Sequence, residues 1–77
     1  MKYSSIIFTK VLSGLFQQRI LTAEKRNALM SEWRKSISEG SREKLCDLLS
    51  ELLYLVDNRV WKKELGDAMD MISEGRV

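Results

Sequence analysis

Apolar residues recur at helical spacing along almost the whole chain, and strand-like alternation is weak. A first helix is predicted to begin just after Ser4 or Ser5 and to run to about Gln18. Its apolar residues form one broad face, with Lys10 on the opposite side; the face contains Ile7, Phe8, Val11, Leu12, Leu15 and Phe16. Gly14 lowers the helical propensity by roughly 1 kcal/mol relative to alanine, which suggests that a neighbouring helix approaches closely there.

Two further helices are marked by their caps. Thr22 is a good N-cap for a second helix that ends at Gly40, a residue suited to the left-handed conformation that often follows a helix. The apolar stripe of this helix contains Leu29, Met30, Trp33 and Ile37. A third helix should start near Ser41. Its apolar residues span nearly half the circumference, which is typical of a central helix that contacts several others; they are Leu45, Leu48, Leu49, Leu52, Leu53, Leu55 and Val56.

The last helical region is predicted to be interrupted. Asp57 can cap it, and its apolar residues Trp61, Leu65, Ala68 and Ile72 keep helical spacing. Gly66 lies in the middle and is expected to divide the region into helices 58–65 and 67–74. The sequence therefore predicts an all-α fold, a compact bundle of five short helices, or of four if Gly66 is tolerated. The connections are short, as in helical bundles.

Length and composition fit one small domain that covers residues 1–77. A chain of 77 residues buries only about 60% of its unfolded surface, so modest stability is expected. The single cysteine excludes an internal disulfide. Cys46 lies among leucines, and we interpret it as a small buried apolar residue rather than as a reactive thiol.

Charge is distributed unevenly along the chain. The net charge is only +2, but residues 1–26 hold five basic groups and one acidic group, whereas residues 42–77 hold six basic and eight acidic groups. The first 23 residues contain no acid at all; their basic residues are Lys2, Lys10 and Arg19. Such asymmetry predicts a polarised surface whose positive part is the N-terminal helix.

Targeting segments are not evident in the sequence. Lys10 interrupts the apolar run after three residues, and Gln17, Gln18 and Arg19 stand where a cleavage region would be, so a cleavable signal peptide is not expected. No stretch approaches the roughly 18 apolar residues of a membrane-spanning helix. The expected location is the cytoplasm or the periphery of the inner membrane.

Catalytic and metal-binding chemistry has little support. Histidine is absent, a single cysteine is too few for a zinc site, and the glycine-rich loops that hold phosphates are missing. We therefore expect a protein that is not an enzyme and has no cofactor or metal. Basic residues are scattered among acids after Glu24 and form no stripe, so no nucleic-acid partner is expected.

Contact with a membrane has two supports in the sequence. The first is the acid-free N-terminal helix, and the second is a repeated triplet, Trp33-Arg34-Lys35 and Trp61-Lys62-Lys63. An indole can lie at the headgroup level while neighbouring cations reach phosphates. Both tryptophans also fall within the apolar stripes of their helices. The pattern favours core positions in a closed bundle and is compatible with membrane contact if the bundle opens.

A family resemblance covers all 77 residues. The start MKYSSIIFTKVLSGLFQQRILTAEKR, the length and the helical pattern with Trp33, Cys46 and Trp61 resemble the PAS factor family of small Vibrio proteins, regarded as activators of protein secretion. The resemblance implies a saposin-like fold of five helices, lipid binding, and release of periplasmic proteins to the medium. Saposins carry three disulfides, which this chain lacks, so packing alone would hold its fold. The resemblance implies no catalytic residues.

The leading hypothesis is a non-enzymatic factor that associates with anionic phospholipid membranes, perturbs them and thereby aids secretion. The alternative is a small protein-interaction module, such as an adaptor, chaperone or regulator, that binds an acidic partner. A monomer or a weak homodimer is expected. The predicted contact residues are Lys2, Ile7, Phe8, Lys10, Val11, Leu12, Leu15, Phe16, Arg19, Lys25, Arg26, Trp33, Arg34, Lys35, Trp61, Lys62 and Lys63.

Overall fold

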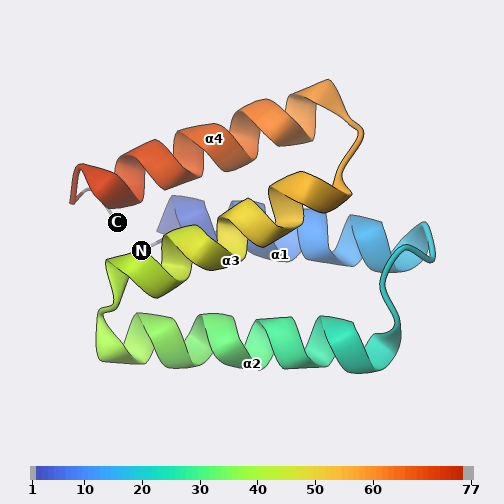
Figure 1. Ribbon diagram of the computed structural model, residues 1–77, viewed down its shortest axis with the longest axis horizontal. Helices are drawn as coiled ribbons and strands as arrows, with labels where there is room; N and C mark the ends of the chain where they lie inside the picture. Colours follow the sequence, from blue (N-terminus) through green and yellow to red (C-terminus); the bar gives the residue numbers. More distant parts are fainter. Residues whose placement is uncertain (1, 76–77) are drawn as a thin grey trace.

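The computed structural model describes residues 2–75, and this part of the chain forms four helices (Figure 1). They are α1 (Lys2–Gln17), α2 (Ala23–Glu39), α3 (Arg42–Leu55) and α4 (Arg59–Ser73). Each helix runs roughly antiparallel to the one before it (Figure 1). The prediction of an all-α fold is confirmed.

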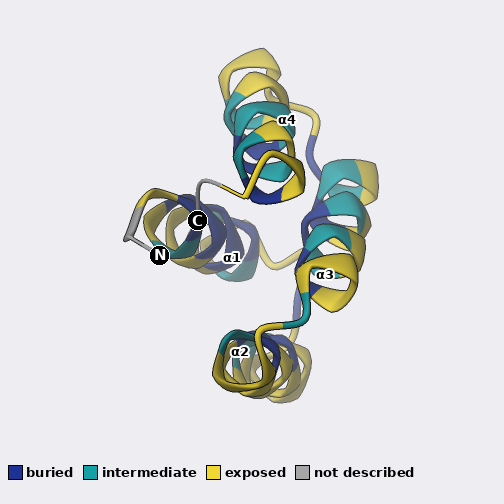
Figure 2. Cartoon of the chain, turned by 90° about the vertical axis from the view of Figure 1, so that its left-hand side faces the viewer, coloured by how far each residue is buried: buried dark blue, intermediate teal, exposed yellow. Residues whose placement is uncertain are grey.

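The four helices surround one core. Viewed along the bundle, α2 and α4 lie on opposite sides, with α1 and α3 between them (Figure 2). In the described chain α2 and α4 make no contact with each other, whereas α1 and α3 each contact all three other helices. The prediction that residues 45–56 form a central helix is therefore confirmed.

The core draws most heavily on α1 and α3. From α1 the buried apolar residues are Ile7, Phe8, Val11, Leu12 and Leu15, and from α3 they are Leu45, Leu49 and Leu52, with Val56 following directly. Helix α2 contributes only Leu29, Trp33 and the small polar Ser36 to the fully buried set. Helix α4 contributes Leu65, Ala68 and Ile72. The apolar stripes seen in the sequence thus all face the same interior.

Local capping explains where α2 and α3 begin and where α2 ends. The hydroxyl of Thr22 accepts a hydrogen bond from the Lys25 amide at 3.1 Å, and Ser41 plays the same role at the start of α3. Gly40 adopts φ 65°, the left-handed conformation that glycine tolerates best. The caps predicted at Thr22 and Gly40, and the start of α3 predicted near Ser41, are confirmed.

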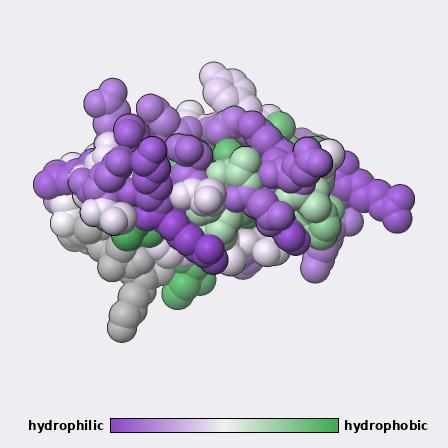
Figure 3. Space-filling view, turned by 90° about the horizontal axis from the view of Figure 1, so that it is seen from below, coloured by the Kyte–Doolittle hydropathy of each residue, from purple (hydrophilic) through white to green (hydrophobic). Residues whose placement is uncertain are grey.

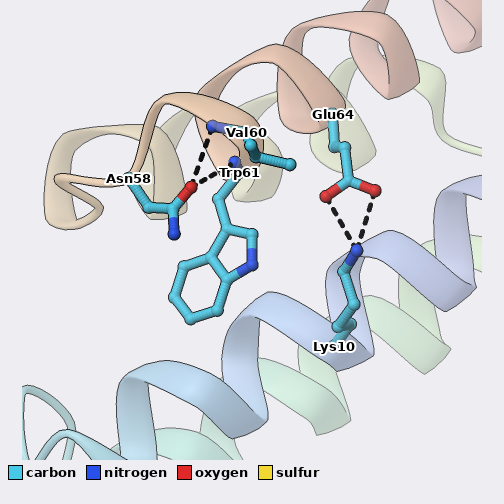
Figure 4. A network of polar contacts seen from close by, with 5 residues as sticks. All are labelled: Lys10, Asn58, Val60, Trp61 and Glu64. Atoms are coloured by element: carbon cyan, nitrogen blue, oxygen red, sulfur yellow. Dashed lines mark hydrogen bonds and ion pairs between the residues drawn. The ribbon is translucent and has the colours of Figure 1, made fainter.

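Three details of the prediction are wrong. Helix α4 continues through Gly66, so the described residues form four helices and not five. The N-cap of α4 is Asn58 and not Asp57, because the Asn58 side chain accepts from the amides of Val60 and Trp61 at 2.8 and 3.1 Å (Figure 4). Helix α1 begins at Lys2, before Ser4, since no residue near its start breaks the helix.

The bundle has two distinct ends. The α1–α2 and α3–α4 connections lie at one end, which we call the loop end and define as residues 16–27 and 50–63 (Figure 1). The start of α1, the α2–α3 connection and the end of α4 lie at the other, which we call the terminal end (Figure 1). The longest dimension of the molecule is 32 Å, so charges at the two ends are well separated.

Candidate functional site: the loop end

The apolar face of α1 is not available at the surface of this structure. Ile7, Phe8, Val11, Leu12 and Leu15 are all buried in the core. Phe16 is half-buried, and the guanidinium of Arg26 lies 4.2 Å from the centre of its ring. Contact of this face with a bilayer would require the bundle to open.

Trp33 is a core residue and not a surface anchor. Its side chain is 2% exposed and stacks on Phe8, with ring centroids 4.2 Å apart and planes 10° from parallel. The indole N–H donates to the Ser5 hydroxyl at 3.1 Å, so its polar atom is satisfied inside the bundle. Trp33 therefore occupies a core position in this structure and not a membrane-facing one.

Trp61 is only half-buried and packs across α1. An added Cβ at Gly14 would come within 2.7 Å of the Trp61 Cζ2 atom and closer still to Cη2. The indole therefore lies directly on the backbone of α1, where any side chain at position 14 would overlap it. The close approach expected at Gly14 is confirmed, and Trp61 is the residue that approaches (Figure 4).

Several predicted contact cations are engaged in ion pairs within the protein. Lys10 Nζ lies 2.7 Å from both carboxylate oxygens of Glu64, and this pair joins α1 to α4 (Figure 4). Lys63 pairs with Asp67 one turn along α4, at 3.1 Å. Lys25 lies 3.5 Å from Glu51 of α3. These cations are partly neutralised in the closed bundle.

Four other predicted cations are exposed and make no ion pair with a described residue: Arg19, Arg34, Lys35 and Lys62. They do not form one cluster. Arg34 and Lys35 lie toward the terminal end of α2, whereas Arg19 and Lys62 belong to the loop end. The Lys2 side chain lies outside the part that the structure describes. Seen from the α2 side, the surface is mainly hydrophilic, with smaller apolar areas between polar side chains (Figure 3).

The loop end combines exposed apolar side chains with positive charge, a combination that the sequence did not reveal. Ile20 is 47% exposed, Val60 is 64% exposed and Tyr54 is 90% exposed. The same end holds six basic residues (Arg19, Lys25, Arg26, Arg59, Lys62 and Lys63) and three acidic ones (Glu24, Glu51 and Asp57). The rest of the chain holds seven basic and eight acidic residues. The excess positive charge of the protein therefore resides at the loop end.

An open cleft of about 440 Å³ adjoins the loop end. It lies between α3 and α4 and is lined by Ser50, Leu53, Tyr54 and Lys62. The lining thus brings together apolar surface, a hydroxyl and an ammonium group. Only Lys62 of this set was predicted as a contact residue, because the helical stripe assigned Leu53 to the core and gave Ser50 and Tyr54 no role.

The described residues give little support for other chemistry. No group of three cysteine, aspartate or glutamate side chains among them could hold a metal ion. Cys46 is half-buried rather than fully buried, and its sulfur lies 3.9 Å from the Met69 carbonyl oxygen. None of the helices in residues 2–75 is both long enough and apolar enough to cross a membrane.

Comparison of the chain with models of protein families, with curated proteins and with solved structures finds no match. The resemblance to PAS factor and the saposin-like fold it implies therefore stay expectations.

Proposed function

We propose that this protein is a non-enzymatic factor that associates reversibly with anionic phospholipid membranes through its loop end. One observation carries the proposal: the loop end joins three exposed apolar side chains to six of the basic residues of the chain, two of which, Lys25 and Lys63, are ion-paired within the protein. A surface of this kind suits the interface of a bilayer, where apolar groups enter the acyl boundary and cations approach phosphates. The four helices stay packed together when the loop end contacts the membrane.

The expected energies are sufficient for reversible binding. Each basic residue near an anionic surface contributes about 1 kcal/mol. Burial of the exposed parts of Ile20, Tyr54 and Val60 adds roughly 25 cal/mol for each Å² of apolar area removed from water. The cost of immobilising the protein at the surface offsets much of this gain. The net binding free energy is therefore small, and the association is reversible.

The backbone at Arg19 ends α1 and fixes the shape of the loop end. Arg19 has φ 63° and is the only non-glycine residue in the described chain with a positive φ. The left-handed conformation costs a non-glycine residue roughly 1 kcal/mol. It allows the Ile20 amide to donate to the Leu15 carbonyl at 3.0 Å, which fixes the chain where Arg19 and Ile20 are exposed. A left-handed residue with this hydrogen bond is a common way for a helix to end, so it explains how Arg19 and Ile20 are held at the surface.

The resemblance to the PAS factor family extends the proposal from membrane binding to membrane perturbation and secretion. Membrane perturbation by this chain would promote the release of periplasmic proteins, and the fold would be a saposin-like variant held by packing alone. The apolar face of α1 would enter a bilayer only after opening, so in this account it acts after the loop end has docked. Release of a periplasmic enzyme to the medium, measured with and without the protein, tests this step. No increase in release would contradict it.

A matched pair of variants tests docking by the loop end. Val60→Ser and Ile6→Ser each remove an exposed apolar side chain from a helix, and the two positions are exposed to nearly the same extent, 64% and 62%. Only Val60 belongs to the loop end. We expect Val60→Ser to reduce flotation with phosphatidylglycerol vesicles severalfold and Ile6→Ser to leave it near wild type. Equal losses would contradict the assignment of the surface.

Vesicle leakage tests perturbation as distinct from binding. We expect release of a trapped dye from anionic vesicles at micromolar protein, and weaker release as salt is added, because salt screens the attraction between exposed charges. Neutral phosphatidylcholine vesicles serve as the control. Binding without leakage would leave the protein as a membrane-associated factor and contradict perturbation.

A second candidate function is a protein-interaction module for an acidic partner. The observation that favours it is Tyr54, because exposed tyrosines and arginines are the residues that most often dominate protein interfaces. Tryptophan fluorescence distinguishes the two candidates. A blue shift of the Trp61 emission on addition of anionic vesicles supports the membrane, whereas an unchanged spectrum together with stoichiometric binding to one purified protein supports the module.

A further inference from the structure

The cleft between α3 and α4 has the composition of a site for a small anionic amphiphile. Leu53 and Tyr54 give it apolar walls, while Ser50 and Lys62 are the polar residues of its lining. Its volume of about 440 Å³ falls within the range of roughly 300–1,000 Å³ that is typical of ligand pockets. Among the described residues, Lys62 has no ion-pair partner and the Ser50 hydroxyl has no hydrogen-bond partner.

We propose that this cleft binds the phosphate headgroup of an anionic amphiphile. The ammonium of Lys62 and the hydroxyl of Ser50 donate hydrogen bonds to phosphate oxygens, as lysine and serine commonly do at phosphate sites. Leu53 and Tyr54 contact the first carbons of the apolar chain. The inference rests on the proposed function, because it assigns to the loop end a specific place for one lipid headgroup. The ligand class is a phosphate-bearing lipid.

Titration of the full-length protein followed by NMR tests the proposal. The probe is dihexanoyl phosphatidic acid, kept below the concentration at which it forms micelles, and inorganic phosphate is titrated separately. We expect saturable shifts at Ser50, Leu53, Tyr54 and Lys62 with the lipid. Binding of inorganic phosphate should be at least tenfold weaker, since it has no apolar chain to bury. Equal affinities for the two probes would overturn the assignment of an amphiphile.

Two variants locate the binding in the cleft. Lys62→Gln should weaken the affinity for the lipid about tenfold, because a hydrogen bond to a charged group is lost. Ser50→Leu should weaken it at least as much, because it removes a hydroxyl from the lining and fills part of the cleft. Ser31→Leu adds the same side chain to an exposed position of α2 and should leave the affinity unchanged. Unchanged lipid binding by Ser50→Leu, with the fold intact by circular dichroism, would overturn the site.

Failure of this inference can be distinguished from failure of the proposed function. Vesicle flotation without saturable shifts in the cleft overturns the headgroup site and leaves membrane association in place. Saturable shifts that depend on Lys62, without flotation on any vesicle, support the cleft as a site for a dissolved phosphate-bearing amphiphile and overturn membrane association.

Discussion

The two tryptophan triplets have nearly the same sequence but different environments. In Trp33-Arg34-Lys35 the indole is buried against Phe8, and the two cations lie on the outer side of α2 toward the terminal end. In Trp61-Lys62-Lys63 the indole is half-buried on the backbone of α1, and Lys62 lines a cleft beside exposed apolar residues. A tryptophan followed by two cations thus does not define a membrane anchor. What surrounds the triplet in the fold decides its role.

The largest expected effect distinguishes the two indoles by stability. Trp33→Ala removes a fully buried ring, its stack on Phe8 and its hydrogen bond to Ser5, and should lower the free energy of unfolding by about 3–5 kcal/mol. For a small domain this is a large part of the total. Trp61→Ala should cost less, because that ring is only half-buried. Urea denaturation measures both, and a greater loss for Trp61→Ala would reverse the comparison.

A smaller effect is expected where Trp61 meets α1. Gly14→Ala places a methyl group against the indole, and the resulting overlap should destabilise the protein by about 1–3 kcal/mol despite the better helical propensity of alanine. The Trp61 indole N–H resonance should shift, while that of Trp33 should stay in place. Increased stability with both resonances unchanged would show that Gly14 is not needed for the close approach.

The smallest effect concerns the ion pair beside Trp61. Lys10→Gln removes the pair with Glu64, whose partners are 47% and 23% exposed in their side chains. Because solvent screens such a pair, the expected loss is about 0.2–1 kcal/mol. A double-mutant cycle with Glu64→Gln isolates the coupling. A coupling well above 1 kcal/mol would mean that the pair, and not the indole, holds α1 against α4.

Local signals made most of the fold predictable. The hydroxyls of Thr22 and Ser41 cap their helices by contacts within three residues, and Gly40 ends α2 by its own backbone conformation. Glycine has a low helical propensity, which is why a break was predicted at Gly66. The buried side chains of Leu65 and Ala68 on either side of it keep α4 continuous. The error at Asp57 arose because Asn58, the next residue, is an equally good cap.

The candidate site was harder to predict because it depends on which helix ends meet. Ile20 and Val60 are 40 residues apart in the sequence and lie at the same end only because consecutive helices are antiparallel. The high exposure of Tyr54 at the end of a leucine-rich helix has no local signal either. Charge counted along the chain pointed to the N-terminal helix, but Lys10 is paired with Glu64. Arg19 and Lys62 were predicted as contacts, although not as parts of one end.

The most direct test of docking by the loop end compares charge reversal in the two triplets. Lys62→Glu and Lys35→Glu change the net charge equally, and both lysines are exposed without an ion-pair partner in residues 2–75. Their effects should differ, because the Debye length of about 8 Å at physiological salt is far shorter than the 32 Å molecule. We predict that Lys62→Glu weakens flotation with phosphatidylglycerol vesicles roughly thirtyfold, at about 1 kcal/mol for each unit of charge, and that Lys35→Glu stays within about twofold of the wild type. Equal weakening by the two variants, or a greater loss for Lys35→Glu, would contradict docking by the loop end.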